Sequence, residues 1–174
     1  MKLNPTKCAF EVSSGKFLEF MVSYKGIEAN LDKIQAILNM EPPRNIKEVQ
    51  SLIERVAALN RFISKATDKC LPFFKVLREA FEWTNECQKA FQDLKAYLIA
   101  APLLSLSILG DELYLYLAMS SHAVSLALIR EEGEIQKLVY YISRALKGAE
   151  GWYPMIEKLA FALVAAFRRL RHNF

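Results

Sequence analysis

The sequence predicts an α+β protein built in two parts. Residues 1–108 combine a β-hairpin pattern with amphipathic helices, whereas residues 109–174 contain three strand patterns and one final helix. The first part rests on a capped apolar stripe over residues 45–64. The second rests on the change after Glu112 to short apolar runs separated by turn residues.

The N-terminal hairpin is predicted over residues 8–29. CAFEV and FLEFMVS have strand composition, SSGK is expected to form the turn between them, and YKG turns the chain again before IEA.

Helices are predicted from residue 31 to residue 98. A short helix over residues 31–40, with Ile34, Ile37 and Met40 on one face, should end before the prolines at 42 and 43. In the helix over residues 45–64, Asn45 caps the first turn and Glu48 stands in the capping-box position. Its apolar stripe comprises Val49, Leu52, Ile53, Val56, Ala57, Leu59, Phe62 and Ile63.

Two more helices complete this part. One is expected over residues 71–78. The other begins after Thr84, which is a suitable N-cap, and ends near Leu98. The expected buried side of this last helix carries Cys87, Phe91, Leu94 and Leu98.

The second part is predicted to contain strands over residues 113–118, 123–130 and 136–143, and a helix over residues 154–171. The first strand, LYLYLA, has no charged residue, so we expect it inside a sheet with both faces covered. The final helix is apolar nearly all round and therefore expects neighbours on both sides. We accordingly expect the domain to extend beyond residue 174.

Composition limits the classes of function. The net charge of +4 is a mild bias toward anionic partners and does not establish nucleic-acid binding. No signal-peptide pattern or membrane-length apolar run occurs, which favours a cytoplasmic or nuclear location without secretion or membrane insertion. The cysteines Cys8, Cys70 and Cys87 form no C-x-x-C, and His122 and His172 lack ligand spacing, so a zinc site is not expected.

A series of motifs in order along the chain carries a family resemblance: KCAF, GKFLEFMVSYKGIEA, PPRNIKEVQSLIERVAALNRFI, FEWTNECQKAFQDLKAYL, LYLYLAMSSHAVSLALIREE and YPMIEKLAFALV. The series resembles the polymerase of gypsy-class long-terminal-repeat retrotransposons, particularly plant ones. The resemblance implies the end of the palm with its primer-grip hairpin, a helical thumb and connection up to residue 108, and then a partial RNase H-like domain. That last domain would be a three-stranded antiparallel sheet with one helix.

The resemblance also implies which catalytic groups are missing. The palm's Tyr-x-Asp-Asp motif would lie upstream, and no Asp-Asp pair occurs here, so this chain alone should not polymerise DNA. In active RNase H-like relatives, Asp and Glu bind magnesium at the positions of Ala118 and Leu159. Neither side chain has an oxygen ligand for magnesium, so we expect no catalytic residue, metal ligand or cofactor in this chain. Glu157 survives, but it is two residues from Leu159 and does not share its helix face.

Nucleic-acid-binding residues are implied by position in the family. Lys16 and Phe17 lie in the primer-grip hairpin, and Lys47, Gln50 and Arg55 lie on the thumb helix that follows the minor groove. The partner would be an RNA–DNA hybrid or template–primer duplex, bound without sequence specificity. Where the family usually has glycine, this chain has Glu19 and Glu54, and Leu31 stands where proline is common, which indicates a degenerate, truncated copy or a changed duplex path.

Several alternatives remain open at this level. The thumb-helix residues also fit an ordinary exposed helix face, and Arg168, Arg169 and Arg171 fit either a phosphate patch or a cluster complementing the helix dipole. Core packing is favoured over base stacking for Phe73, Phe74, Tyr97, Tyr114 and Tyr116. Glu131, Glu132 and Glu134 fit a solvated turn better than a metal site. The chain is interpreted as a non-catalytic support within the polymerase polyprotein, against an intact nuclease, a domesticated protein-interaction module or a non-functional remnant.

Overall fold

The computed structural model describes residues 13–17, 20–108 and 110–170. It has the predicted α+β fold, with two three-stranded antiparallel sheets in the described part of the chain. The N-terminal lobe begins with the small sheet β1 (Ser14–Phe17), β2 (Phe20–Ser23) and β3 (Gly26–Ala29). Its helices are α1 (Leu31–Leu38), α2 (Ile46–Ala58), the 3₁₀-helix η2 (Asn60–Phe62), α3 (Ala66–Lys69), α4 (Leu71–Arg78) and α5 (Asn85–Ile99).

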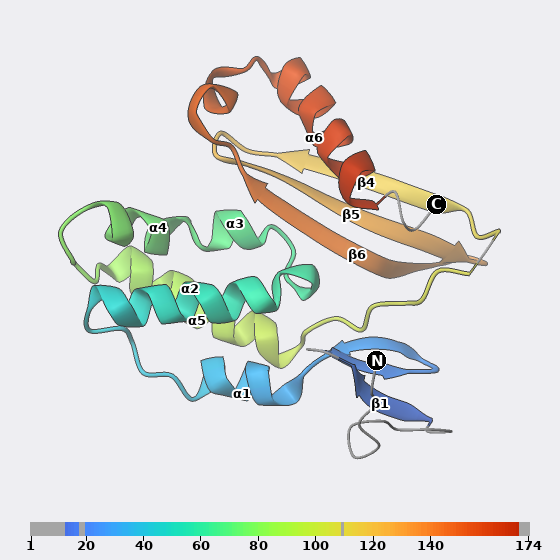
Figure 1. Ribbon diagram of the computed structural model, residues 1–174, viewed down its shortest axis with the longest axis horizontal. Coiled ribbons are helices and arrows are strands. Elements are labelled where there is room, and N and C mark those ends of the chain that lie inside the picture. The colour runs from blue at the N-terminus through green and yellow to red at the C-terminus, as the bar shows by residue number, and fades with distance from the viewer. Residues whose placement is uncertain (1–12, 18–19, 109, 171–174) are drawn as a thin grey trace, which may run out of the picture.

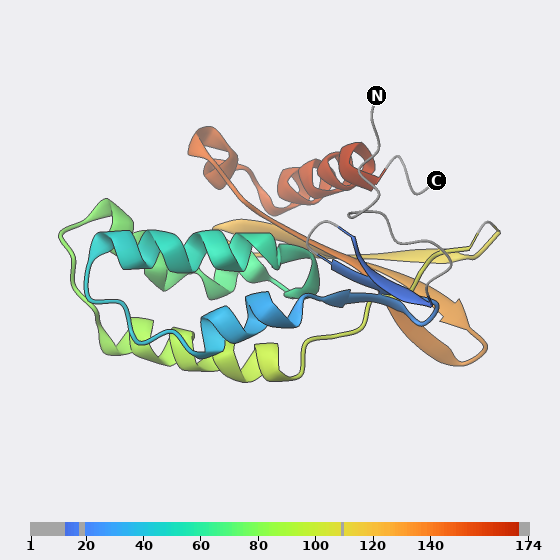
Figure 2. The same ribbon diagram turned by 60° about the horizontal axis from the view of Figure 1, so that its bottom comes forward.

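The C-terminal lobe has strands β4 (Leu113–Met119), β5 (Ala123–Glu132) and β6 (Ile135–Ala145), then the 3₁₀-helix η3 (Gly148–Trp152) and helix α6 (Met155–Leu170). The strand order is β4-β5-β6. Figure 1 shows helices α1–α5 gathered beside this sheet, and Figure 2 shows α6 covering one of its faces.

Local sequence determines where the main helices begin. The Asn45 side chain caps α2 by accepting a 3.0 Å hydrogen bond from the Glu48 N–H, and Thr84 caps α5 by accepting a 3.3 Å bond from the Cys87 N–H. The expected capping box differs in one respect. The Glu48 carboxylate accepts from the Arg44 N–H at 2.7 Å, one residue before the cap, and so fixes the chain entering α2.

Two expectations for the N-terminal lobe are wrong. The predicted turn SSGK is largely strand, because Ser14–Phe17 pair with β2 as β1; CAFEV lies outside the described residues. The predicted helix over residues 45–64 is two elements. The backbone leaves the α-helix at Leu59, whose N–H bonds to Val56 O at 3.0 Å, and η2 then turns Phe62 and Ile63 into the core.

The core of the N-terminal lobe lies between α1, α2, α4 and α5. The predicted apolar stripes are confirmed there, except that Ala57 is exposed. Phe73 stacks on Trp83 with ring centres 5.8 Å apart, and Trp83 meets Phe91 edge-on at 6.0 Å. The largest fully buried side chains of this core are Ile37, Leu52, Leu59, Phe62, Ile63, Phe73, Phe91, Leu94, Leu98 and Leu104.

The expectation that the first C-terminal strand has both faces covered is wrong. Among the described residues β4 pairs only with β5, so it is an edge strand. Leu115 and Leu117 face a core shared with Ala166 and Leu170 of α6. On the other face Tyr114 and Tyr116 are exposed, so the core packing expected for these two tyrosines is also wrong.

Hydrogen bonds join the two lobes. The Thr67 N–H at the start of α3 donates to Ser143 Oγ in β6 at 3.0 Å, and Ser120 Oγ donates to Asp68 Oδ1 at 2.7 Å. In the connection between the lobes, the Ser105 N–H donates to Leu138 O at 2.6 Å. These bonds join β6 and the β4–β5 turn to α3, and β6 to the chain that connects the lobes.

No helix in the described ranges is long and apolar enough to cross a membrane.

Candidate nucleic-acid interface

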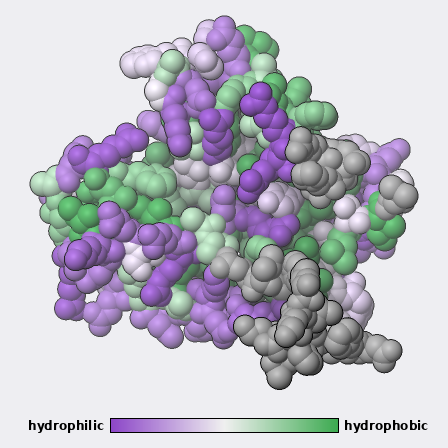
Figure 3. Space-filling model, in the orientation of Figure 1, coloured by the Kyte–Doolittle hydropathy of each residue, from purple (hydrophilic) through white to green (hydrophobic). Residues whose placement is uncertain are grey.

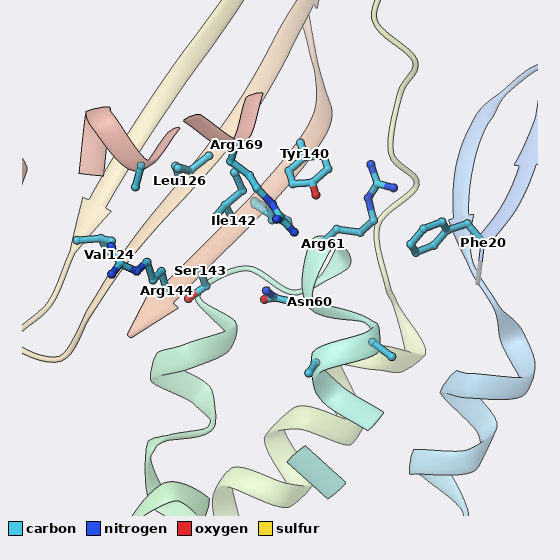
Figure 4. Close-up of a pocket in the computed structure, with 14 residues that line it drawn as sticks. Phe20, Asn60, Arg61, Val124, Leu126, Tyr140, Ile142, Ser143, Arg144 and Arg169 are labelled. Carbon is cyan, nitrogen blue, oxygen red and sulfur yellow. The ribbon is translucent and has the colours of Figure 1, made fainter. Parts of the chain in front are cut away.

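A pocket of about 380 Å³ lies where the two lobes meet, between η2, the β6 edge of the sheet and α6. Figure 4 shows the polar side chains that point toward it from these three elements. Its charged residues are Arg61, Arg144 and Arg169, and no described residue lining it is acidic. In the space-filling view, hydrophilic residues gather around this junction (Figure 3). The pocket therefore offers positive charge to an anion.

Arg61 is held in the pocket wall by two aromatic rings. Its guanidinium carbon lies 4.8 Å from the ring centre of Phe20 and 4.5 Å from that of Tyr140. Burial lowers the pKa of Arg61, the Tyr140 side chain opposes this shift, and the nearby charge of Arg169 adds to it. Arginine nevertheless stays protonated in proteins. Arg61 is therefore a fixed, half-buried cation.

Two polar atoms beside the pocket have no hydrogen-bond partner among the described residues. They are Arg61 Nε and Asn60 Oδ1, and both are buried. Buried polar atoms normally find a partner, which is often water or a ligand when the protein supplies none.

The other two arginines of the pocket differ in whether a carboxylate pairs with them. Arg144 pairs with Glu150 at 2.9 Å and lies over the Phe161 ring at 4.5 Å. Arg169 is exposed on α6 and has no carboxylate within ion-pair distance among the described residues. Arg61 and Arg169 are thus the cations of the pocket for which the described residues supply no counter-ion. Arg168, the neighbouring basic residue, is exposed, and Arg171 lies outside the described residues.

The predicted thumb-helix residues lie on α2, which leads directly to this pocket. Lys47, Gln50 and Glu54 are exposed and share one side of the helix, and Ala57 and Ala58, at its end, line the pocket. We call the exposed side chains of Lys47, Gln50 and Glu54 the α2 face. Arg55 was predicted to contact nucleic acid. In the structure its guanidinium donates a 2.6 Å hydrogen bond to Ala36 O and so joins α2 to α1.

The predicted primer-grip residues are described in part. Lys16 is exposed on β1 and forms a 3.2 Å ion pair with Asp32 of α1. Phe17 is the last residue of β1, but its side chain lies outside the described part, as does Glu19. The structure does not bring Lys16 into the Arg61 pocket.

The two family metal positions do not converge. Leu117 faces the core shared with α6, so Ala118, the next residue of β4, points to the opposite face of the sheet. Leu159 is half-buried on the side of α6 that also carries Ala162 and Ala166, which are buried. Glu157 is exposed. Across the described ranges, no group of three or more His, Cys, Asp or Glu is placed to hold a metal ion.

Sequence reasoning missed Arg61, Asn60, Tyr140 and Arg144. A usable signal was present, because Asn60 and Arg61 interrupt an otherwise apolar run from Leu59 to Ile63. The aromatic residues fall partly as expected. Phe73 is core, and the Tyr97 hydroxyl donates to Phe62 O at 3.0 Å and accepts from the Ser64 N–H at 3.2 Å.

These features define an α+β module with a basic junction between a helical lobe and a three-stranded sheet. Residues 83–174 match the family described as an RNase H-like domain found in reverse transcriptase, and the chain belongs to that family. The matched region contains α5 and the whole C-terminal lobe.

Similar proteins include the Tf2-3 and Tf2-4 transposon polyproteins of Schizosaccharomyces pombe. Each is 25% identical over 173 residues, which is 98% of this chain and 13% of the polyprotein. The chain thus spans only a small part of the length of these relatives.

Solved structures show the same fold. A foamy viral protease-reverse transcriptase in complex with an RNA/DNA hybrid matches with a TM-score of 0.79 at 21% identity, covering 95% of this chain and 23% of that one. The structure of the foamy viral protein with dsDNA matches with a TM-score of 0.77 at 20% identity, covering 96% of this chain and 36% of that one.

Proposed function

We propose that this chain supports an RNA–DNA hybrid or template–primer duplex within a retrotransposon reverse transcriptase of the gypsy class, plant-type in sequence, and does not cut it. The observation that carries the proposal is the junction, where Arg61 and Arg169 face a pocket without an acidic residue at the end of the α2 face. The similarity to transposon polyproteins and to the foamy viral complexes supports it.

Binding would act through the phosphate backbone. Lysine and arginine contacts to phosphates position a duplex without reading its sequence. Lys47 and Gln50 would meet one stretch of duplex along the α2 face, Lys16 and Phe17 another at the hairpin, and Arg55 would help through the position it gives α2. Glu54 lies on the same side as Lys47 and opposes phosphate binding there, so we expect weak binding.

The absence of cleavage would follow from the metal positions. Hydrolysis of a hybrid by this family's chemistry requires magnesium held by carboxylates, and the family positions here carry Ala118 and Leu159. Their side chains also point to different sides of the sheet. The remaining polymerase polyprotein, not this chain, would supply the chemistry. The site of action would be cytoplasmic, in a virus-like particle, or nuclear.

A second role has an observation of its own. Helix α6 exposes a row of apolar side chains, namely Met155, Ile156, Leu163, Val164 and Phe167. Such a row is typical of a surface that another protein segment covers. The exposed apolar row of α6 would fit a partner segment from the rest of the polyprotein. It equally supports the alternative role of a protein-interaction module.

The test is fluorescence anisotropy of a labelled RNA–DNA hybrid with the purified chain, across a salt series and with magnesium present. We expect binding that weakens steeply with salt, because phosphate contacts release counter-ions, and an intact hybrid on a denaturing gel. A folded chain that binds no hybrid at low salt would leave the interaction module as the better account. A chain that does not unfold cooperatively would indicate a decayed remnant.

A further inference from the structure

Arg61 and Arg169 come from distant parts of the chain and meet in the junction pocket. Arg61 belongs to η2 in the N-terminal lobe, and Arg169 to the last turn of α6 in the C-terminal lobe. Figure 4 shows Arg169 reaching from α6 past Tyr140 toward Arg61. Two positive charges in a partly desolvated space repel each other, so an opposite charge is needed to stabilise this arrangement.

The described residues offer these charges no carboxylate. Glu150 is the ion-pair partner of Arg144, the third arginine of the pocket. It accepts a 2.9 Å hydrogen bond from Arg144 and a 2.8 Å hydrogen bond from the Lys147 N–H. Each Glu150 oxygen thus accepts one of these hydrogen bonds, and Glu150 forms its ion pair with Arg144 and not with Arg61 or Arg169. Since no carboxylate of the described ranges balances Arg61 and Arg169, a bound anion would stabilise the pair.

The donors suit a phosphate in particular. The Phe20 and Tyr140 rings both lie near the Arg61 guanidinium, whose carbon is 4.8 and 4.5 Å from their centres, and a guanidinium holds its N–H donors in one plane. A planar fork of donors matches the oxygens of a phosphate, and a second guanidinium from Arg169 can contact the same group. Both rings also limit the rotamers of Arg61, which lowers the entropy lost when it binds.

We propose that the junction pocket binds one backbone phosphate of the nucleic-acid strand, held between Arg61 and Arg169. This inference rests on the proposed function. It places at the pocket the contact that both lobes make with the strand. The α2 face ends in this pocket through Ala57 and Ala58, so a strand lying along α2 would reach it. The pocket volume of about 380 Å³ leaves room for the sugar beside the phosphate.

Arg169→Ala tests the proposal, because Arg169 is exposed and its loss should not disturb the fold. The matched control is Arg78→Ala, which removes an exposed arginine at the end of α4, outside the pocket. Arg61→Gln is a second variant that keeps much of the side-chain volume. Cooperative unfolding of each variant shows that it is folded.

Hybrid binding is measured by anisotropy across a salt series. We expect Arg169→Ala to weaken binding several-fold at low salt and to reduce the slope of log K against log salt by about 1, as the loss of one phosphate contact does. Arg61→Gln should act in the same direction, and Arg78→Ala should leave the slope unchanged. If Arg169→Ala and Arg61→Gln behave like Arg78→Ala, the phosphate assignment is wrong while the proposed function stands.

Inorganic phosphate provides a second readout. At matched ionic strength it should raise the unfolding temperature of the wild-type chain more than chloride does, and this difference should vanish in Arg169→Ala. If the wild-type chain binds no hybrid, the proposed function fails first. If phosphate still stabilises the chain in that case, the pocket binds free phosphate and the assignment to a nucleic-acid strand is wrong. If phosphate does not stabilise the wild-type chain, the anion site itself is wrong.

Discussion

The Thr67 N–H donates a 3.0 Å hydrogen bond to Ser143 Oγ, and so joins the start of α3 to the edge strand β6 of the β4–β6 sheet. Ser143 Oγ also lies 3.0 Å from Ser125 Oγ on the neighbouring strand. Ser125 is buried, and Ser143 is half-buried. The Ser143 hydroxyl of the C-terminal lobe thus satisfies a backbone donor of the N-terminal lobe.

Ser143→Ala should destabilise the whole chain. The substitution leaves the Thr67 N–H and the Ser125 hydroxyl without this partner, and an unsatisfied polar group costs about 1–3 kcal/mol. Chemical denaturation measures the loss. Ser121→Ala is the matched control, because Ser121 is exposed in the β4–β5 turn and should change stability by less than about 0.5 kcal/mol. Equal effects of the two substitutions would contradict the role of Ser143.

Gly26→Ala should be among the most damaging small changes. Gly26 has φ +141°, and an added Cβ would lie 2.2 Å from Leu104 O. That carbonyl accepts the 2.8 Å bond from the Ile27 N–H which holds β3 against the chain entering the C-terminal lobe. We expect a loss of about 2 kcal/mol or more, from strain and a displaced backbone.

Gly133→Ala separates conformational strain from steric overlap. Gly133 has φ +65° in the β5–β6 turn, and nothing lies within 4 Å of an added Cβ. Left-handed backbone alone costs an alanine about 1–2 kcal/mol. Denaturant midpoints of both variants should therefore show the larger loss at Gly26, and the reverse order would contradict the Gly26–Leu104 packing.

Cys70 should resist thiol reagents in the folded chain. It is buried between α3 and α4, and burial raises the pKa of its thiol to about 12 from an ordinary value of 9.0, partly opposed by Lys69. Between these two pH values the unfolded chain has lost this proton while the folded chain keeps it. Stability from this group is therefore full below pH 9.0 and falls as the pH rises toward 12.

Iodoacetamide labelling read by peptide mass spectrometry checks the Cys70 prediction. At pH 9 the rate at Cys70 should follow global unfolding and rise with denaturant. Cys70→Ala should also reduce the alkaline loss of stability above that pH. Labelling of native Cys70 as fast as in the unfolded chain would show that the site is open.

Restoring the family carboxylates should not restore cleavage. In Ala118→Asp with Leu159→Glu, the first carboxylate would point away from α6 and the second toward the sheet, so the pair would not share a metal. A gel assay of hybrid cleavage with magnesium and manganese, beside an active ribonuclease H, tests this. Metal-dependent cleavage by the double variant and by neither single variant would place both positions in one site.

Local chemistry made part of the fold predictable. Asn45 and Thr84 cap helices through short-range hydrogen bonds, and the apolar spacing of Cys87, Phe91, Leu94 and Leu98 identifies a buried side without tertiary information. The three C-terminal strands and the final helix were predicted to within a few residues of their ends for the same reason.

Other features depend on contacts distant in sequence. Ser14 and Gly15 have turn composition, yet they pair with β2. The run around Tyr114 and Tyr116 has the same apolar character in an edge strand as in a central one, so its exposure could not be predicted from composition.

The junction pocket was least predictable. Arg61 and Arg169 line one pocket because α6 packs on β4 and β5, whereas β6 of the same sheet packs against η2. Periodicity describes one element at a time and therefore could not indicate this pair. The predicted α2 residues were exposed as a helix pattern indicates, but their continuity with the pocket depends on the packing of the two lobes.

The most direct measurement of the central claim is lysine acetylation of the chain with and without an RNA–DNA hybrid, read residue by residue by mass spectrometry. Lys47 is exposed on the α2 face, and Lys89 is exposed on α5, outside that face. We expect the hybrid to slow the acetylation of Lys47 several-fold and to leave Lys89 unchanged, because the duplex lies along α2 toward the junction. Equal protection of both lysines, or protection of Lys89 alone, would contradict this interface.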